Sequence, residues 1–232
     1  MSGSQGGQAG QGRPRRLAVL ISGGGSNLQA LIDAQESGTL TGAEIVLVVS
    51  NRADAYGLQR ALQHKLPAIH LPWTKRSQQA EAEEKLAALF ALFKVDLIVL
   101  SGWMRIFTPA FIERYPWRII NQHPALLPLD GVGDEVITSD GSVIPALRGL
   151  HVVGRALEAG LKVTGCTVHY VIPEVDAGRV VCRAEVPICE GDTEEGLYER
   201  VKVVERRLIV EAVRRVVNGG VPGAPPLDPA RD

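Results

Sequence analysis

The sequence predicts an α/β protein whose mostly parallel, Rossmann-like sheet carries helices on both faces. Continuous apolar runs, such as 17–21 and 97–100, are typical of parallel strands that are covered on both sides. Amphipathic helical patterns alternate with these runs along most of the chain, as in repeated strand–helix units. Two later strand patterns, 163–171 and 180–186, are joined by a connection too short for a helical crossover. We therefore expect an antiparallel strand pair near the C-terminus.

Composition limits the classes of function. The 232 residues suffice for one large α/β domain, and 45% hydrophobic with 22% charged residues is the composition of an ordinary soluble globule. The formal net charge of -1 argues against a nucleic-acid partner. No apolar run reaches transmembrane length and no signal peptide opens the chain, so we expect a cytoplasmic protein without a membrane partner. The 3 cysteines form no Cys-x-x-Cys pair, which favours neither disulfides nor a metal site.

The chain is expected to form a single domain over 15–218. Positions 1–14 are rich in Gly, Gln and Ser, which predicts a disordered tail, and Gly and Pro dominate 219–232, which predicts a flexible one. Within the domain, 129–149 interrupts the strand–helix rhythm. Its two β-prone runs around an Asp-Gly pair suggest an inserted hairpin. Such an excursion is either a lid or a surface decoration.

Three glycines at 23–25 lie between the first strand and an amphipathic helix. Backbone N–H groups in such a turn can approach an anion, and the helix N-terminus adds its positive end, so this is a candidate phosphate site. Two familiar phosphate loops fit poorly, because no lysine follows Gly25 and Leu28 stands where a dinucleotide loop has its third glycine. A plain tight turn is the alternative.

The middle of the chain continues the alternation. Strands are predicted at 44–50, 68–71 and 97–100, and helices at 55–64 and 77–93. The segments that begin at Ser22, Ser101 and Asn121 all follow apolar strands. Because ligands sit beyond the carboxyl ends of the parallel strands in an open α/β sheet, we expect these three strand exits to meet at one site.

Asn121 and His123 follow the apolar pair Ile119-Ile120 at the end of a buried strand. They are one pleat period apart, so their side chains point to the same face, and Pro124 keeps His123 extended. An amide beside a titratable ring suits acyl-type chemistry, because the amide can donate to a developing oxyanion and the ring can exchange the proton. The alternative is a strand-end histidine that bonds only to local backbone.

A long C-terminal helix completes the predicted fold. Asp192 can cap its start, with Glu195 three residues further on. Its buried stripe would be Leu197, Val201, Val204 and Leu208. A shorter helix is predicted at 151–160, where a glycine suits its end.

Three motifs in order resemble the glycinamide ribonucleotide formyltransferases: Gly-Gly-Gly-Ser-Asn at 23–27, Asn-Gln-His-Pro at 121–124 and Glu-Val-Asp-Ala-Gly at 174–178. The resemblance covers about 17 to about 217. The Asn-x-His-Pro motif with a later Asp belongs to the wider family of enzymes that use 10-formyltetrahydrofolate. The glycine turn together with Glu205 narrows the resemblance to the enzymes that act on glycinamide ribonucleotide. The resemblance implies a formyltransferase fold, 10-formyltetrahydrofolate as co-substrate, no metal, and formyl transfer to the amine of 5-phosphoribosylglycinamide in de novo purine biosynthesis.

The resemblance also implies roles for individual residues. The catalytic group would be Asn121, His123 and Asp176, the last being a carboxylate that raises the pKa of the histidine. The ribonucleotide would be bound by Gly25, Ser26, Asn27, Lys202 and Glu205, and the folate by Met104, Arg105, Ile106, Phe107 and Asn121. Without the resemblance, Asp176 could be a turn residue and Glu205 a solvated helix charge.

Two departures from the family pattern leave roles open. In the family, only about two residues usually separate a Leu-Leu-Pro motif from the Pro-Gly and histidine that follow it. Here this link is expanded by the segment 129–148, which precedes His151. An arginine usually meets the folate tail near the start of the helix at 77–93. When this sequence is aligned to the family without gaps, Gln79 stands at the position of that arginine. Arg76 would take this role only if the alignment were shifted. His169 lies in a strand that could face the site, as a supporting residue at most.

Three other classes of protein share part of this pattern. A formyltetrahydrofolate deformylase has the same Asn-His-Asp group but usually an added N-terminal regulatory domain. A methionyl-tRNA formyltransferase normally adds a C-terminal RNA-binding domain. A non-catalytic nucleotide-binding module would keep the glycine turn without needing the Asn-His-Asp group. We expect small-molecule substrates as the partners, and a monomer or weak homodimer.

Overall fold

The computed structural model describes residues 13–227, and the two ends, 1–12 and 228–232, lie outside the described residues. The predicted N-terminal tail therefore falls outside them except for its last two residues. One of these, Arg13, is held by the buried Asp96 through hydrogen bonds of 2.7 and 3.1 Å. This ion pair attaches the chain to the core two residues before the first strand begins.

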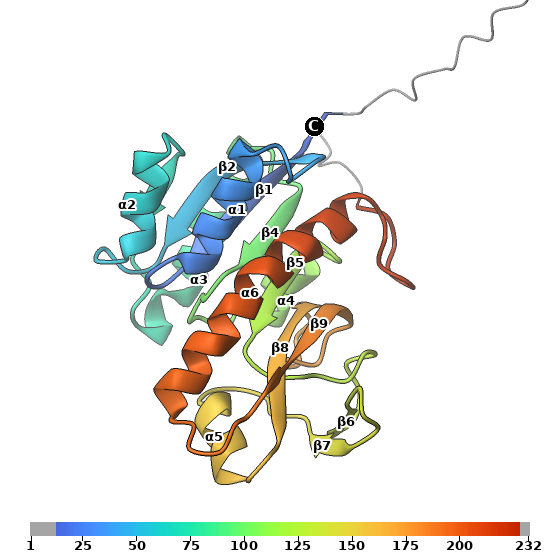
Figure 1. The fold of residues 1–232 in the computed structure, drawn as a ribbon. Coiled ribbons are helices and arrows are strands. Elements are labelled where there is room, and N and C mark those ends of the chain that lie inside the picture. The colour runs from blue at the N-terminus through green and yellow to red at the C-terminus, as the bar shows by residue number, and fades with distance from the viewer. Residues whose placement is uncertain (1–12, 228–232) are drawn as a thin grey trace, which may run out of the picture.

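A seven-stranded sheet forms the centre of the molecule, in the order β3-β2-β1-β4-β5-β8-β9 (Figure 1). Its strands are β1 (Arg15–Ile21), β2 (Ala43–Ser50), β3 (Ala68–His70), β4 (Leu97–Leu100), β5 (Ile119–His123), β8 (Val163–Tyr170) and β9 (Val180–Pro187). The strands from β3 through β5 pair in parallel, whereas β8 and β9 pair antiparallel. The predicted fold class and the antiparallel C-terminal pair are both confirmed.

Helices cover both faces of the sheet. One face, here called the α6 face, packs against α1 (Ser26–Glu36) and α6 (Glu194–Val217) through residues such as Val19 and Ile209. The opposite α3 face packs against α3 (Gln79–Leu92) and α4 (Pro109–Glu113). Figure 1 shows α1 and α6 on one side of the strands and α3 on the other. The remaining helices are α2 (Tyr56–Gln63), α5 (Val152–Glu158) and the short 3-10 turn η1 (Arg76–Gln78).

Two helix starts differ from the sequence prediction. The short helix α4 was not predicted, because five residues are too few to show a period; Thr108 caps it by accepting a hydrogen bond from Phe111 N at 3.2 Å. The cap of α6 is Thr193, not Asp192, since Thr193 Oγ1 accepts from Gly196 N at 3.1 Å. Asp192 instead accepts a hydrogen bond from Cys189 N and pairs with Arg200.

The segment from 219 to 227 packs more closely than its composition suggested. Val221 and Leu227 are buried, and both belong to the hydrophobic core on the α6 face. Flexibility was expected from 219 onward because Gly and Pro dominate there. The two apolar side chains among them bury enough surface to hold this part of the chain on the core. The rest of the predicted tail lies outside the described residues.

The inserted segment contains the hairpin expected of it, with β6 (Glu135–Ile137) paired antiparallel to β7 (Val143–Pro145) in a separate two-stranded sheet. Two side chains of β9 hold this hairpin. Glu185 accepts hydrogen bonds of 2.6 Å from both N and Oγ of Ser139. Arg183 donates to Leu127 O at 2.7 Å and to Ile137 O at 2.8 Å. The hairpin is therefore docked on the edge of the main sheet.

Two kinds of feature are absent from the part of the chain that the structure describes. No helix between 13 and 227 is both long and apolar enough to cross a membrane. Within the same residues, no cluster of three or more His, Cys, Asp or Glu side chains is placed to hold a metal ion. The three cysteines are free thiols, with Cys166 and Cys182 buried and Cys189 exposed.

Candidate active site

The three polar strand exits meet, as predicted, at the carboxyl edge of the sheet. β1, β4 and β5 are neighbours and parallel, so the segments that follow them emerge side by side. Ser22 joins two of these segments, because its Oγ accepts a hydrogen bond from Met104 N at 2.9 Å and donates one to Asn51 Oδ1 at 2.6 Å. The glycine turn and the segment at 104–107 are thereby held in a fixed relation.

Asn121, His123 and Asp176 come together on the α3 face. His123 Nδ1 lies 3.4 Å from Asp176 Oδ2, and Asn121 Nδ2 lies 3.5 Å from Asp176 Oδ1. The amide and the ring share a face because they are two residues apart in β5. The His123 ring is 3% exposed, so any reaction at this group is shielded from bulk water. Three residues predicted to act together are therefore in contact.

Asp176 occupies a left-handed backbone conformation, with φ of 52°. Asp and Asn tolerate this region better than most residues. Arg148 donates from Nε to Asp176 O at 3.1 Å, and Gly149 N donates to Asp176 Oδ2 at 2.9 Å. These bonds set the direction of the carboxylate toward the His123 ring.

His169 belongs to the same cluster. It lies directly opposite Asn121 across the β5–β8 pairing, with Nε2 3.2 Å from Asn121 Nδ2 and 3.4 Å from Asp176 Oδ1. Its Nδ1 donates to Tyr170 O at 2.8 Å, and its Nε2 faces both the Asn121 amide and the Asp176 carboxylate. The predicted supporting position of His169 thus has direct contacts to two members of the candidate catalytic group.

Burial and charge act in opposite directions on the two titratable partners. Burial raises the pKa of the Asp176 carboxyl, but the hydrogen bond from His169, the charge of His123 and the N–H of Gly149 together lower it to about 2. Burial lowers the pKa of His123, and Asp176 and the Leu147 carbonyl counteract only part of that effect. The expectation of a raised pKa for His123 is therefore wrong for this state, because desolvation of the imidazolium outweighs its attraction to the carboxylate.

The inserted segment reaches this group through its last residues. Leu147 O accepts a hydrogen bond from His123 Nε2 at 2.7 Å. Arg148 also donates to Gly133 O at 2.7 Å, so it connects the loop before the hairpin with the backbone of Asp176. The sequence offered no signal for these contacts, because main-chain atoms make most of them. His151, whose role was open, is exposed at the start of α5.

The glycine turn is shaped by a close backbone approach. Gly25 has a φ of 69°, and a Cβ there would lie 2.7 Å from the Cα of Gly57 in α2. Gly57 N donates to Gly23 O at 3.1 Å. Ser26 begins α1, and no side chain caps that helix start, so its first N–H groups point outward as an anion site requires. A side chain at Gly25 would force α2 away from the turn.

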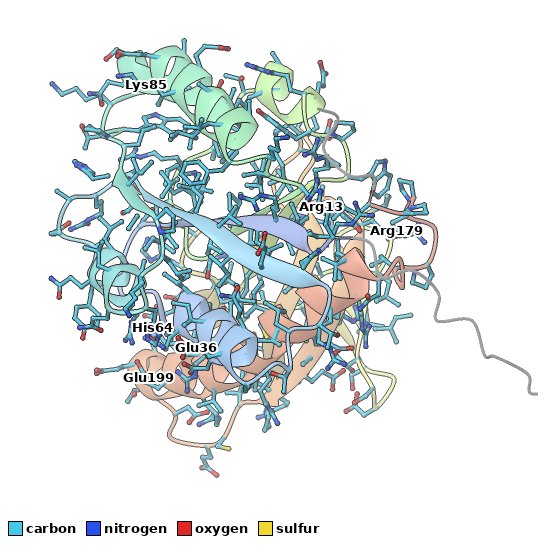
Figure 2. All side chains as sticks on the ribbon, turned by 90° about the horizontal axis from the view of Figure 1, so that it is seen from above. Arg13, Glu36, His64, Lys85, Arg179 and Glu199 are labelled. Atoms are coloured by element: carbon cyan, nitrogen blue, oxygen red, sulfur yellow. The ribbon has the colours of Figure 1, made fainter. Side chains whose placement is uncertain are left out.

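Arg60, which the sequence analysis missed, also supports this turn. Its Nε donates to Gly24 O at 2.9 Å and its Nη1 to Gln29 Oε1 at 3.0 Å. Gln29 Nε2 lies 3.1 Å from His64 Nε2, and His64 Nδ1 lies 2.6 Å from Glu36 Oε1. Figure 2 shows His64 and Glu36 next to each other beside α1. The arginine has no motif to reveal it, since its contact is to a main-chain oxygen.

Glu205 is buried on α6, with 6% exposure, and burial raises the pKa of its carboxyl. A hydrogen bond with the Asn27 side chain lowers this pKa in part and joins α6 to the glycine turn. The charge of Lys202 also lowers the pKa of Glu205. Its ammonium lies 2.6 Å from Glu199 Oε1 and 4.4 Å from the centre of the Tyr198 ring. Glu205 is therefore joined to the glycine turn, whereas the Lys202 ammonium pairs with Glu199.

The segment at 104–107 alternates between exposed and buried side chains. Met104 and Ile106 are 60% and 69% exposed, while Phe107 is buried against Trp103 and Phe111. The Nε of the half-buried Arg105 has no hydrogen-bond partner among the described residues. Two exposed apolar side chains over a backbone held by Ser22 could receive a flat ring.

Gln79, the residue that ungapped spacing puts where the family usually has an arginine, contacts this segment. Gln79 Nε2 donates to Ile106 O at 3.1 Å and to Glu83 Oε1 at 3.0 Å. Arg76 is exposed in η1. The position given by ungapped spacing is thus in contact with the segment at 104–107.

Comparison with known proteins identifies the family to which the chain belongs. The formyl transferase family matches residues 15–213, and this chain belongs to that family. Within it, the chain is 38% identical to a phosphoribosylglycinamide formyltransferase from Haemophilus influenzae, over 88% of either protein. The glycinamide ribonucleotide transformylase 1 structure from Symbiobacterium toebii superposes with a TM-score of 0.79 at 37% identity, covering 94% of each chain. The resemblance inferred from the three motifs is confirmed.

A further relative is much longer than this chain. The trifunctional purine biosynthetic protein adenosine-3 of Drosophila melanogaster is 39% identical over 89% of this chain, which corresponds to 14% of the length of that relative. The match covers one part of a protein with several activities.

Proposed function

We propose that this chain transfers the formyl group of 10-formyltetrahydrofolate to the amine of 5-phosphoribosylglycinamide, giving formylglycinamide ribonucleotide and tetrahydrofolate in de novo purine biosynthesis. The observation that carries the proposal is the meeting of Asn121, His123 and Asp176 at one edge of the sheet, beside an uncapped helix start. The named relatives support this choice of substrates.

The ribonucleotide would lie between α1 and α6. Its phosphate would bind the turn at Gly25, Ser26 and Asn27, where backbone N–H groups and the helix dipole favour an anion. The glycinamide end would point to Glu205, whose carboxylate accepts hydrogen bonds from the amine. Lys202 would approach the same substrate from the margin of the site. The contact between Asn27 and Glu205 supports this placement, because it brings the two ends of the substrate site together.

The folate would lie along the segment formed by Met104, Arg105, Ile106 and Phe107. Main-chain N–H and C=O groups of this segment can bind the polar edge of the pterin ring, and the exposed Met104 and Ile106 side chains can cover its flat face. Asn121 lies on the adjacent strand, so the formyl group would come next to its amide. Gln79, held against the same segment, is the candidate for contact with the folate tail.

The reaction needs a neutral amine, a stabilised oxyanion and a proton for the leaving nitrogen. The amine attacks the formyl carbon, and the carbonyl oxygen becomes an oxyanion that the Nδ2 group of Asn121 can bind. Such a donor typically contributes about 100-fold to 1,000-fold to the rate. The amine loses one proton and N10 of the folate gains one as the carbon–nitrogen bond to N10 breaks. No covalent enzyme intermediate is needed, because the amine is itself the nucleophile.

His123 would supply the positive charge and the proton through Nδ1. Its Nε2 proton is already donated to Leu147 O, so a second proton must be held on Nδ1, which faces Asp176. Asp176 is ionised and lies close enough to stabilise the imidazolium. Closure of the site over the substrates would place the oxyanion near Nδ1 and so favour protonation of His123 at the moment of reaction.

One assay distinguishes this transferase from its alternatives. Tetrahydrofolate release from 10-formyltetrahydrofolate is followed with and without 5-phosphoribosylglycinamide. We expect release only when the ribonucleotide is present. Release without it would contradict the proposal in favour of a deformylase, and no release under either condition would favour a non-catalytic nucleotide-binding module.

The proposed setting follows from the substrates. Both are small, water-soluble molecules, so we propose that the protein acts in the cytoplasm, as a monomer or weak homodimer, without nucleic-acid or membrane partners. Size-exclusion chromatography with light scattering at several protein concentrations measures the assembly state. A stable higher oligomer would contradict this part of the proposal.

A further inference from the structure

Gln122 is buried, and its side-chain amide has no hydrogen-bond partner among the described residues. It is 7% exposed, and neither its Oε1 nor its Nε2 has a partner among residues 13–227. Buried polar side chains are nearly always paired, because an unpaired amide loses its hydration without compensation. Gln122 also stands between Asn121 and His123, the two best-placed members of the candidate catalytic group. An unpaired amide at this position indicates a group made to meet a ligand.

The alternation of β5 directs Gln122 to the α6 face. Asn121 and His123 point to the α3 face, so the residue between them points the other way. Gln122 lies directly opposite Val168 of β8, and Ile120, two residues earlier, packs with Val168 in the core on the α6 face. The amide is therefore on the side of the sheet that carries the glycine turn and Glu205.

Two more unpaired polar atoms gather on that face. Ser101 Oγ is buried without a partner among the described residues, and so is Asn27 Oδ1. The β4–β5 register pairs Leu100 with Asn121, which sets Ser101 beside Gln122. Asn27 contacts Glu205. Buried polar atoms without partners among the described residues thus come from β5, from α1 and from the position directly after β4, and Asn27 links this group to Glu205.

We propose that Gln122 is a substrate-binding residue that recognises the amide joining glycine to the ribosyl group. The inference rests on the proposed function and deepens it. A glutamine amide offers a carbonyl acceptor and two N–H donors, so it can pair with either the N–H or the C=O of a substrate amide. In the proposed pose this linkage lies between the phosphate at Gly25 and the amine at Glu205. Gln122 would thereby select an amide over an ester or a shorter amine.

The test is a direct binding measurement on the full chain. In Gln122→Met the side chain keeps its length but loses both hydrogen-bonding groups. We expect the Kd for 5-phosphoribosylglycinamide, measured by isothermal titration calorimetry, to rise about 10-fold to 100-fold, because the substrate amide is left unpaired. The KM for 10-formyltetrahydrofolate should not change. The Tm of the ligand-free protein should stay the same or rise, because a buried unpaired amide has been removed.

A matched control is Gln35→Met, in which a structural glutamine amide is removed. Gln35 Oε1 accepts from Ile45 N at 2.6 Å, so this variant should have a lower Tm and an unchanged Kd. If Gln122→Met lowers the Tm while the Kd is unchanged, the role of Gln122 is structural and the inference is overturned. Gln122→Ile, whose branched side chain suits a strand, is measured in the same way, and failure of both variants to fold would also overturn it.

The outcome for the wild-type protein separates the two proposals. If the wild-type chain binds the ribonucleotide and Gln122→Met binds it equally well, the inference about Gln122 fails while the proposed function stands. If the wild-type chain neither binds the ribonucleotide nor transfers formyl to it, the proposed function fails and the inference fails with it.

Discussion

His123 donates its Nε2 proton to the main-chain oxygen of Leu147 at 2.7 Å, across 24 positions of sequence and the whole inserted hairpin. This bond fixes the ring and leaves Nδ1 facing Asp176 at 3.4 Å. It also means that the end of the insertion touches the candidate catalytic group. Substitutions at the contacting residues can test each part of this arrangement.

Asp176→Asn should lower kcat by about 100-fold to 1,000-fold, because the imidazolium of His123 loses the charge that stabilises it. Asparagine is the suitable substitution, since it also tolerates the φ of 52° found at this position. Steady-state kinetics with both substrates measures the effect. Asp54→Asn is the control, because Asp54 pairs with Arg52 at the exposed surface and should leave kcat unchanged. Turnover near the wild-type value in Asp176→Asn would exclude the assigned role.

The ring of His123 should titrate below the usual histidine range in the ligand-free protein. Burial lowers its pKa and Asp176 raises it, so removal of the carboxylate in Asp176→Asn should lower the pKa further. NMR of the labelled histidines can measure the pKa of the His123 ring in both proteins, because the chain contains only 5 histidines. A ring pKa above the usual range, or one that does not move in Asp176→Asn, would contradict the balance of burial and charge described above.

Asp176 should make the stability of the protein depend on pH in acid. Its folded pKa of about 2 lies below the ordinary 3.8, so the unfolded chain takes up this proton first as the pH falls. The carboxylate therefore contributes about 2 kcal/mol to the free energy of unfolding above pH 4, and this is lost as the pH falls toward 2. Urea unfolding at a series of pH values should show this loss in the wild-type protein and a flatter curve in Asp176→Asn. If stability fell with pH in parallel in the two proteins, this contribution of Asp176 would be excluded.

Gly25→Ala should abolish binding of the ribonucleotide phosphate. The new Cβ would lie 2.7 Å from the Cα of Gly57, and the residue would keep a φ of 69°. Gly38→Ala separates these two effects, because Gly38 has a φ of 71° but a Cβ there would meet no atom within 4 Å. Both variants should lose roughly 1–2 kcal/mol of stability to backbone strain, and only Gly25→Ala should lose binding. If Gly25→Ala and Gly38→Ala bound the ribonucleotide equally well, the turn at Gly25 would not be the phosphate site.

Arg148→Met should lower kcat about 10-fold, because Asp176 would be held less firmly. The arginine donates to Asp176 O at 3.1 Å and to Gly133 O at 2.7 Å, and methionine retains its length without these donors. Arg52→Met serves as the control for loss of an exposed arginine. Hydrogen exchange should become faster in the loop that contains Asp176. An unchanged kcat would show that the other contacts of Asp176 suffice.

Most elements and the antiparallel pair near the C-terminus were predictable because their signals are local. An apolar run such as 97–100 must be covered on both faces, and the short 172–179 connection permits only an antiparallel pair. The pairing of Asn121 with His123 on one face also follows from spacing alone. By contrast, the start of α6 at Thr193 could not be separated from Asp192, since both residue types make good caps.

The sequence by itself determined the fold class, the family and the candidate chemical groups, because strand burial, pleat period and residue type are encoded within a few neighbouring positions. Only the tertiary structure decided how those groups are held: that Asp176 lies against both Asn121 and His169, that Leu147 O fixes His123, and that burial lowers the pKa of its ring. These contacts join segments up to 55 positions apart, and several use main-chain atoms that every residue possesses. Their formation depends on loop paths and strand register, which no local pattern records.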